Sequence, residues 1–152
     1  MRIAVGADHA ACELKAHLLT WLRTRGLEPV DIGPPEPSVE DDYPDISQAV
    51  CRSVLGGDCQ LGIMMCGTGI GSCIAANKIP GIRAALCHDT YSARLSRLHN
   101  DANILCLGAR VVGKGLAREI VAAWLGEHFS EEARHRRRLE KVAALERAEK
   151  GR

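Results

Sequence analysis

The chain has 152 residues, of which 46% are hydrophobic, so it can bury the core of one domain and does not have the composition of a disordered or fibrous protein. Twenty Lys and Arg balance nineteen Asp and Glu, which rules out a chain that is basic throughout and argues against a wholly nucleic-acid-binding surface. The charge is uneven, because residues 134–152 hold eight Lys and Arg against three Asp and Glu, a net charge of +5. This segment is expected to meet an anion or an acidic surface.

The seven cysteines form no C-x-x-C pair, so the sequence indicates neither a disulfide framework nor a zinc site. The first apolar run follows Met1 and Arg2 directly, and no apolar run reaches 18 residues. We therefore expect no signal peptide, no membrane partner and a reducing, cytoplasmic setting.

Short apolar runs alternate with helical patterns along the chain. Residues 2–6 predict a buried strand, and the spacing of Leu14, Leu18, Trp21 and Leu22 then predicts a helix that ends near Gly26. In chain order there follow a strand at 27–32, a Pro-rich acidic loop at 33–43, a helix with Ile46, Val50 and Val54 on one face, a strand at 60–66 and a helix at 69–78.

The second half of the chain continues the alternation. It predicts a strand at 82–87, a helix at 89–98, a strand at 103–108, a helix marked by Leu116, Ile120 and Trp124, and a charged helix at about 131–149. This pattern predicts an α/β fold, a single-domain (1–152) Rossmann-like three-layer sandwich around a five-stranded parallel sheet of order 2-1-3-4-5. The last helix has too few apolar positions to cover much core, so we expect it to pack on a partner subunit.

The predicted strand order reverses between the first and third strands, and ligands bind beyond the carboxyl ends of strands at such a point. The first strand ends in Gly6-Ala7-Asp8-His9, and the third runs into Cys66-Gly67-Thr68-Gly69-Ile70-Gly71-Ser72. The glycine loop is neither a dinucleotide fingerprint nor a P-loop. A C-x₅-R phosphate loop would need Arg at position 72, where this chain has Ser, so a cysteine phosphatase is disfavoured. The backbone amides of the glycine loop can still cradle an anion, and the alternative is a tight strand-to-helix turn.

Cys66 is the one cysteine that this topology places at a helix N-terminus, where a thiol becomes more acidic. The alternative for Cys66 is a small buried hydrophobe, which is the interpretation we adopt for the other six cysteines. Asp8 and His9 can form an acid/base pair or an N-cap. His99 and Asn100 close a helix, where a His is often only a dipole partner.

Arg134 and Arg138 lie four residues apart on the last predicted helix and therefore share one face. Two guanidinium groups at that spacing can hold a phosphate, and the alternative is a solvated basic face. A nucleic-acid site is disfavoured, because the basic run is short and no aromatic residue interrupts it.

The chain closely resembles the type B ribose-5-phosphate isomerases, whose family also holds galactose-6-phosphate and allose-6-phosphate isomerases. The resemblance covers nearly the full length. It rests on GADHA (6–10), DYPD (42–45), CGTGIG (66–71), AANKIPGIRAALC (75–87), YSARLSRLHND (91–101), GARVVG (108–113) and RHRRR (134–138).

The resemblance implies isomerisation of a sugar phosphate between aldose and ketose, without metal or organic cofactor. It implies that Cys66 moves a proton between C1 and C2, that Thr68 assists at the sugar oxygens, and that the amides of Gly67, Thr68, Gly69, Ile70 and Gly71 hold the enediolate. His99, helped by Asp8, would open the ring; His9, Arg110, Arg134 and Arg138 would bind the phosphate, and Asn100 a sugar hydroxyl. Some family members use a glutamate of this loop instead, but this chain has Cys66, and Ser at position 72.

In a parallel sheet the helices end near the amino edge, so His99 is predicted to lie opposite the Cys66 edge of its own subunit. We therefore expect a homodimer with shared active sites, possible also as a dimer of dimers. The alternatives are a hexose-6-phosphate isomerase, a non-catalytic phosphate- or nucleotide-sensing module on the same fold, and a nucleic-acid binder working through the C-terminal segment.

Overall fold

The computed structural model describes residues 1–33, 38 and 41–150, and in this part of the chain five parallel strands form one sheet. The strands are β1 (Arg2–Ala7), β2 (Glu28–Ile32), β3 (Leu61–Cys66), β4 (Ala84–Leu86) and β5 (Ile104–Gly108). The helices are η1 (His9–Ala11), α1 (Cys12–Thr24), α2 (Tyr43–Leu55), α3 (Ile70–Ala76), α4 (Thr90–Asn100), α5 (Lys114–Leu125) and α6 (Ala133–Lys150). The predicted α/β class and the predicted elements are confirmed. Six residues of the predicted loop at 33–43, namely 34–37 and 39–40, lie outside the described residues.

The strand order is β2-β1-β3-β5-β4, so the predicted order 2-1-3-4-5 is wrong at its last two positions. β5 pairs with β3 along Gly62–Cys66 and is completely buried, whereas β4 is three residues long, half-buried and pairs with β5 alone. The longer and more apolar strand occupies the interior position because both faces of an interior strand are covered. The order still reverses between β1 and β3, so the predicted site position is unchanged.

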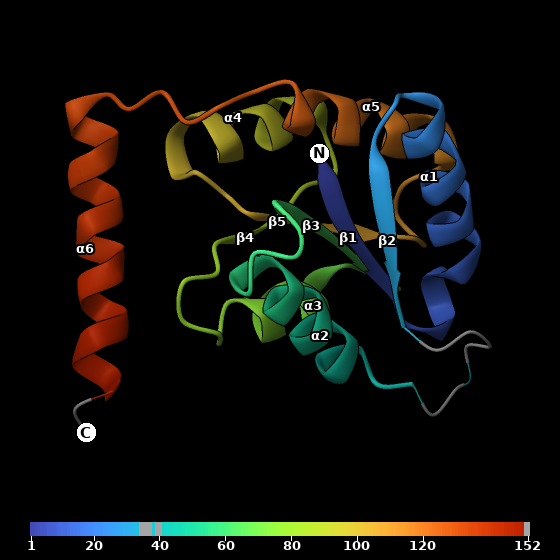
Figure 1. Ribbon diagram of the computed structural model, residues 1–152, viewed down its shortest axis with the longest axis horizontal. Coiled ribbons are helices and arrows are strands. Elements are labelled where there is room, and N and C mark those ends of the chain that lie inside the picture. Colours follow the sequence, from blue (N-terminus) through green and yellow to red (C-terminus); the bar gives the residue numbers. More distant parts are fainter. Residues whose placement is uncertain (34–37, 39–40, 151–152) are drawn as a thin grey trace.

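Helices cover both faces of the sheet (Figure 1). α1, α4 and α5 pack on one face over a core that includes Val5, Leu18 and Trp124, and α2 and α3 pack on the other around Val50 and Met64. α2 approaches the sheet closely because Gly6 and Gly62 carry no side chain there: a Cβ on Gly6 would lie 2.5 Å from the Val50 side chain. This packing fixes the carboxyl ends of β1 and β3 relative to each other.

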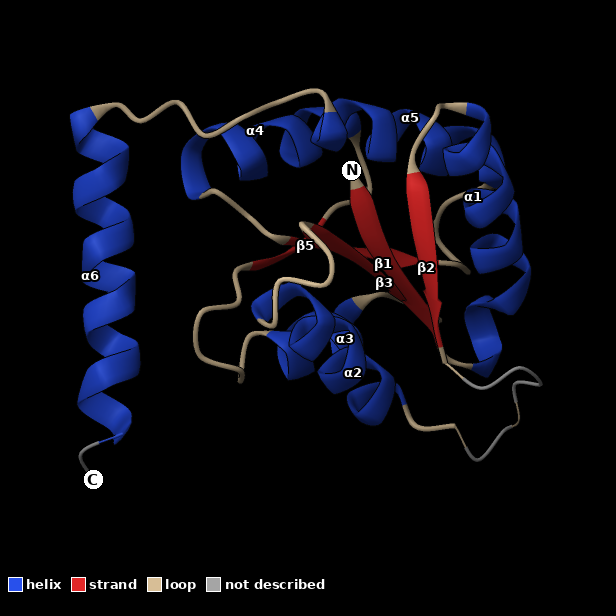
Figure 2. Cartoon of the chain, viewed as in Figure 1, coloured by secondary structure: helices blue, strands red, loops and turns tan. Residues whose placement is uncertain are grey.

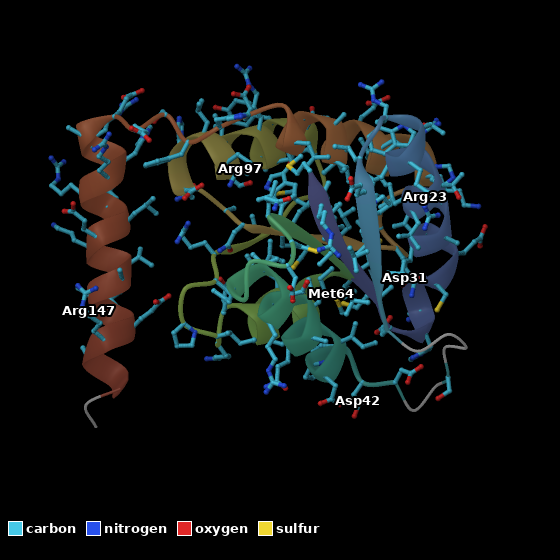
Figure 3. All side chains as sticks on the ribbon, viewed as in Figure 1. Arg23, Asp31, Asp42, Met64, Arg97 and Arg147 are labelled. Carbon is cyan, nitrogen blue, oxygen red and sulfur yellow. The ribbon has the colours of Figure 1, made fainter. Side chains whose placement is uncertain are left out.

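The C-terminal helix α6 stands apart from the layered domain (Figure 2), on the side of the sheet where β4 lies (Figure 1). Met64 lies inside the domain, whereas Arg147 is carried on this outlying helix (Figure 3). α6 contacts α4, and the Glu146 carboxylate accepts a hydrogen bond from the Gly81 N–H at 3.1 Å. Val142 and Leu145 remain 45% and 69% exposed, so this helix leaves apolar surface uncovered in the single chain.

A search of the described residues finds no helix with the length and apolar character needed to cross a membrane.

Candidate active site

The Cys66 sulfur lies at the carboxyl end of β3 and has two hydrogen-bond donors aimed at it. The Gly69 N–H donates to Sγ at 3.1 Å, and the Ser72 hydroxyl lies 3.4 Å from Sγ. Cys66 is 4% exposed, so these donors act where little water competes with them. Donors directed at sulfur stabilise a thiolate, which is the reactive form of cysteine.

The loop from Gly67 to Gly69 can make this contact because Gly69 adopts the left-handed conformation, with φ of 77°. A Cβ on Gly69 would lie 2.8 Å from the Leu107 carbonyl carbon, so the loop presses directly against β5. The segment after β5 also binds the beginning of the loop: the Ala109 and Arg110 N–H groups donate to the Cys66 and Gly67 carbonyls, both at 2.9 Å. The backbone that carries the sulfur is therefore fixed against β5 and the segment that follows it.

Not every amide of the glycine loop faces outward. The Gly69 N–H is directed at the Cys66 sulfur, and the Ile70 N–H donates to the Thr68 hydroxyl at 3.3 Å. Thr68 and Ile70 themselves are exposed, and Gly67 and Gly71 are half-buried. The loop thus combines support for the sulfur with two exposed residues, Thr68 and Ile70, that can meet a ligand.

Asp8 and His9 follow β1 at the same edge of the sheet. The Asp8 carboxylate caps η1 by accepting from the Ala10 N–H at 3.0 Å, and its own N–H donates to the Met65 carbonyl at 3.2 Å. Asp8 is 6% exposed, whereas the His9 side chain is exposed. The N-cap interpretation of Asp8 is therefore correct, and the same placement puts His9 at the edge that carries Cys66.

A second cysteine lies at the beginning of a helix, because Cys12 is the first residue of α1, whereas Cys66 ends β3 and precedes α3 by four residues. The prediction that only Cys66 occurs at the beginning of a helix is wrong, since the 3-10 turn η1 shifts the start of α1 to Cys12. Cys12 differs chemically: its thiol lies against the carbonyls of Asp8 and His9, and its pKa is raised, chiefly by burial. Acceptors around a thiol disfavour the thiolate, so Cys12 remains a structural residue.

Three more side chains reach this edge. The Arg110 guanidinium passes over Gly67, where Nη1 would lie 3.4 Å from a Cβ. His88 accepts a hydrogen bond from the Gly108 N–H at 3.2 Å through Nε2, and the Tyr43 ring packs against Gly71. Sequence reasoning predicted Arg110 but missed His88 and assigned Tyr43 no role. Tyr43 lies in the DYPD run, and this was the available signal.

The other predicted residues lie at the opposite edge, around the end of α4. The His99 ring packs against His135 of α6 at a tilt of 39° with centroids 4.2 Å apart, and His135 Nδ1 is 2.7 Å from the Ser130 hydroxyl. His135 is almost completely buried. Its pKa is lowered, first by lost solvation and then by the charges of His99, Arg134 and Arg138.

Asn100, Arg134 and Arg138 are exposed beside this histidine pair, and Arg134 forms an ion pair with Glu132 at 2.8 Å. Asn100 lies just before Ile104, where β5 begins, whereas Cys66 pairs with Gly108, where β5 ends. A strand rises about 3.3 Å per residue, so the two groups lie about 13 Å apart along the sheet. Within one chain the structure brings together Asp8, His9, Cys66, Thr68 and Arg110, but it does not bring His99, Asn100, Arg134 or Arg138 to them.

The remaining cysteines are not equivalent. Burial raises the pKa of Cys51 and of Cys87 to about 11 each, as expected for small apolar residues. Cys73 departs from the prediction, because it is half-buried and a hydrogen bond with Cys106 lowers its pKa to about 7. The signal was absent from the sequence, since Cys106 belongs to the strand whose position in the sheet was mispredicted.

The chain matches a known family and several named relatives over nearly its whole length. The family described as Ribose/Galactose Isomerase matches residues 3–142. Ribose-5-phosphate isomerase B of Escherichia coli K12 is 48% identical over 145 residues, covering 95% of this chain and 96% of that protein. D-erythrulose-4-phosphate isomerase of Pectobacterium atrosepticum is 44% identical over 150 residues, covering 99% and 98%. The solved structure of ribose-5-phosphate isomerase B from Clostridium thermocellum has a TM-score of 0.93 at 47% identity and covers 97% of this chain and 99% of its own.

Proposed function

Since the chain belongs to the ribose/galactose isomerase family, we propose that it interconverts ribose 5-phosphate and ribulose 5-phosphate. One observation carries the chemistry: the Cys66 sulfur ends β3 under the Gly69 N–H at 3.1 Å, beside a loop with exposed backbone. A base next to hydrogen-bond donors is what proton transfer beside a carbonyl requires.

The reaction proceeds through ring opening and then proton transfers between C1 and C2 and between their oxygens. His99 takes the proton of the C1 hydroxyl as the bond between C1 and the ring oxygen breaks, and it delivers that proton to the ring oxygen, which gives the open-chain aldose. The Cys66 thiolate then removes the C2 proton, and the electron pair moves to form a 1,2-enediolate. The Thr68 hydroxyl relays the proton of the C2 oxygen to the C1 oxygen, and the Cys66 thiol returns a proton to C1, which yields the ketose and restores the thiolate.

The glycine loop supports the enediolate. Its exposed rim around Thr68 places backbone donors and a hydroxyl beside Cys66. One preorganised donor to a developing oxyanion typically lowers a barrier by about 2.7–4 kcal/mol, so this loop contributes as much as the base. The phosphate, held by His9, Arg110, Arg134 and Arg138, orients the reacting carbons.

We propose that the working unit is a homodimer with shared active sites. Cys66 and His99 lie at opposite edges of the sheet in one chain, about 13 Å apart along β5. Joining them requires a second chain, because the strands and the end of α4 are fixed by the core. In a two-fold dimer each site takes Cys66 from one chain and His99, Asn100, Arg134 and Arg138 from the other.

The outlying helix α6 supports this arrangement. A groove of about 420 Å³ lies between it and the β4 edge, with apolar walls from Ile82, Ala84, Ala102, Leu139, Val142 and Leu145. The half-buried strand β4 is also an open sheet edge in the single chain. Apolar surface of this kind at a sheet edge is stabilised by a partner, and we propose that a second copy of this chain covers it.

Mixed dimers test the shared site. Cys66→Ala and His99→Ala chains are each expected to be inactive, but one site in every mixed dimer would be intact. Random mixing should therefore recover about one quarter of the parent activity. The control mixes Cys66→Ala chains with chains that carry both Cys66→Ala and His99→Ala, and this mixture should recover no activity. If confirmed mixed dimers stay inactive, the shared site is wrong.

Solvent deuterium tests the role of Cys66. Incubation of the enzyme and ribose 5-phosphate in D₂O should give ribulose 5-phosphate with deuterium at C1, seen by NMR, and Cys66→Ala should abolish both. Undiminished turnover in that variant would move the base to another residue, and phosphate binding without turnover by the parent would favour a sensing module.

The number of carbons in the preferred sugar phosphate is tested separately. The family also carries the name of galactose isomerase, and one close relative is named for a four-carbon phosphate. One carbon more or less changes the distance from the phosphate to the reacting carbons, so kcat/KM for ribose 5-phosphate, allose 6-phosphate and erythrulose 4-phosphate ranks the three directly. We propose a cytoplasmic location, which suits the seven free thiols of the chain.

A further inference from the structure

Ser72 is completely buried behind the proposed base and takes no part in the chemistry described above. It lies on α3, six residues after Cys66, and its hydroxyl is 3.4 Å from the Cys66 sulfur and 3.0 Å from the Gly69 carbonyl. A buried hydroxyl of this kind has no water to bond, so its partners are the groups that the fold provides.

The Ser72 hydroxyl has a single proton, and its two nearest acceptors are the Gly69 carbonyl and the Cys66 sulfur. When Cys66 is a neutral thiol, the carbonyl of Gly69 is the better acceptor, and it is also the nearer one. When Cys66 is a thiolate, the charged sulfur is the stronger acceptor, because hydrogen bonds to ionised groups are about twice as strong as neutral ones. The proton of Ser72 can therefore follow the charge of Cys66 by a rotation of the hydroxyl.

Ser72 also touches a second sulfur, that of Cys106 on β5. A hydrogen bond with Cys73 and complete burial raise the pKa of Cys106 well above its ordinary value, so Cys106 remains a neutral thiol near neutral pH. It therefore does not compete with the Cys66 thiolate as an anionic acceptor for the Ser72 proton. The surroundings of Ser72 favour donation toward Cys66 once that sulfur is charged.

We propose that Ser72 is a positioning residue that stabilises the Cys66 thiolate by donating its hydroxyl proton to Sγ. It acts in turn on two partners: the hydroxyl donates to the Gly69 carbonyl while Cys66 is a neutral thiol, and it turns to the charged sulfur as a second donor beside the Gly69 N–H. The role of Ser72 in turnover rests on the proposed function, whereas its effect on the acidity of Cys66 can be measured without a substrate.

Other titratable groups lie on the elements packed around the glycine loop and are unchanged by a substitution at Ser72. They are Asp8 after β1, Tyr43 of α2, His88 before α4, Cys106 of β5 and Arg110 after β5. A shift in the titration of Cys66 between the parent and a Ser72 variant therefore reports the lost hydroxyl.

The test measures alkylation of Cys66 by iodoacetamide across pH, resolved by peptide mass spectrometry. Ser72→Ala should raise the pH midpoint of Cys66 alkylation by about one unit, the shift expected for one lost hydrogen bond to a charged group. The acid limb of kcat/KM for ribose 5-phosphate should move in the same direction. At neutral pH kcat should fall about tenfold with KM nearly unchanged, because Ser72 does not reach the substrate.

Ser96→Ala is a matched control. Ser96 is also a buried helical serine that donates to the carbonyl three residues earlier, at 2.8 Å, and it also touches a cysteine, Cys87. This variant should leave both the Cys66 midpoint and kcat at the parent values. Ser72→Thr keeps a hydroxyl and should restore the midpoint, and if its extra methyl prevents folding, the two alanine variants still decide.

The proposal is overturned if Ser72→Ala titrates Cys66 like Ser96→Ala, whatever happens to turnover. A parent enzyme that fails to isomerise ribose 5-phosphate would refute the proposed function instead, and the midpoint comparison would still judge Ser72. A loss of activity in Ser72→Ala with an unmoved midpoint would assign Ser72 a packing role only and so would also overturn the proposal.

Discussion

Gly108, the last residue of β5, has no room for a side chain, and an alanine there should disable the active site while leaving the fold intact. A Cβ on Gly108 would lie 2.5 Å from the Thr68 carbonyl oxygen and 2.7 Å from its carbonyl carbon. Both atoms belong to the backbone of the glycine loop, so no flexible side chain can turn away to relieve the contact. The loop must move as a unit.

The size of that movement follows from the contact. Ordinary van der Waals contact begins at about 3.4 Å, so the Thr68 carbonyl must retreat by about 0.9 Å. A displacement of about 1 Å in a catalytic group can cost about a hundredfold in rate. Overpacking of this kind destabilises by about 1–3 kcal/mol, which a domain of this size tolerates.

The assay compares kcat/KM for ribose 5-phosphate with the midpoint of urea unfolding. Gly108→Ala should lose about two orders of magnitude in kcat/KM while remaining folded at room temperature. Gly115→Ala is the matched control, because a Cβ there meets nothing within 4 Å and the residue lies within α5. Alanine at that helical position should keep full activity and add about 0.5–1 kcal/mol of stability. Parent-like activity in Gly108→Ala would refute the inference that this loop must stay in place.

Three further outcomes are expected. The folded protein lowers the pKa of His135, chiefly by lost solvation, so the unfolded chain binds a proton at this residue more readily. The folded state therefore loses stability as the pH falls below the unfolded pKa of about 6.5. His135→Ala should accordingly lose less melting temperature between about pH 7 and pH 5 than the parent does. Iodoacetamide at neutral pH should label Cys73, with its pKa of about 7, before Cys51, with its pKa of about 11, as peptide mass spectrometry would show. Asp31→Ala leaves the buried Lys15 ammonium without its partner at 2.7 Å and should reduce the free energy of urea unfolding by about 1–2 kcal/mol; an unchanged midpoint would mean that Lys15 finds water instead.

The sequence predicted the fold class well because the signals were local. Apolar runs, helical spacing and glycine stops define each element without reference to its neighbours. The order of the last two strands was not local: it depends on which of β4 and β5 can be covered on both faces. The fully apolar β5 and the short β4 carried that information, but only a comparison of the two strands would have revealed it.

The candidate site shows the same limit. Topology alone placed Cys66 with Asp8 and His9, because the carboxyl ends of neighbouring parallel strands share an edge. The donors at the Cys66 sulfur and the contact of His88 with Gly108 depend on side-chain directions in a loop. The interaction of Cys73 with Cys106 depends on how α3 sits over β5. No periodicity in the sequence encodes any of these three kinds of contact.

The division of the site follows from the fold itself. In a parallel sheet every strand presents its carboxyl end at one edge, and the helices that return the chain end at the other. Cys66 terminates a strand and His99 nearly terminates a helix, so one chain of this topology separates them. In the homodimer proposed above, His99, which lies against His135 of α6, would serve the neighbouring chain rather than its own. Under that proposal activity should fall on dilution, because separating the two chains would also separate the proposed ring-opening group from the proposed base.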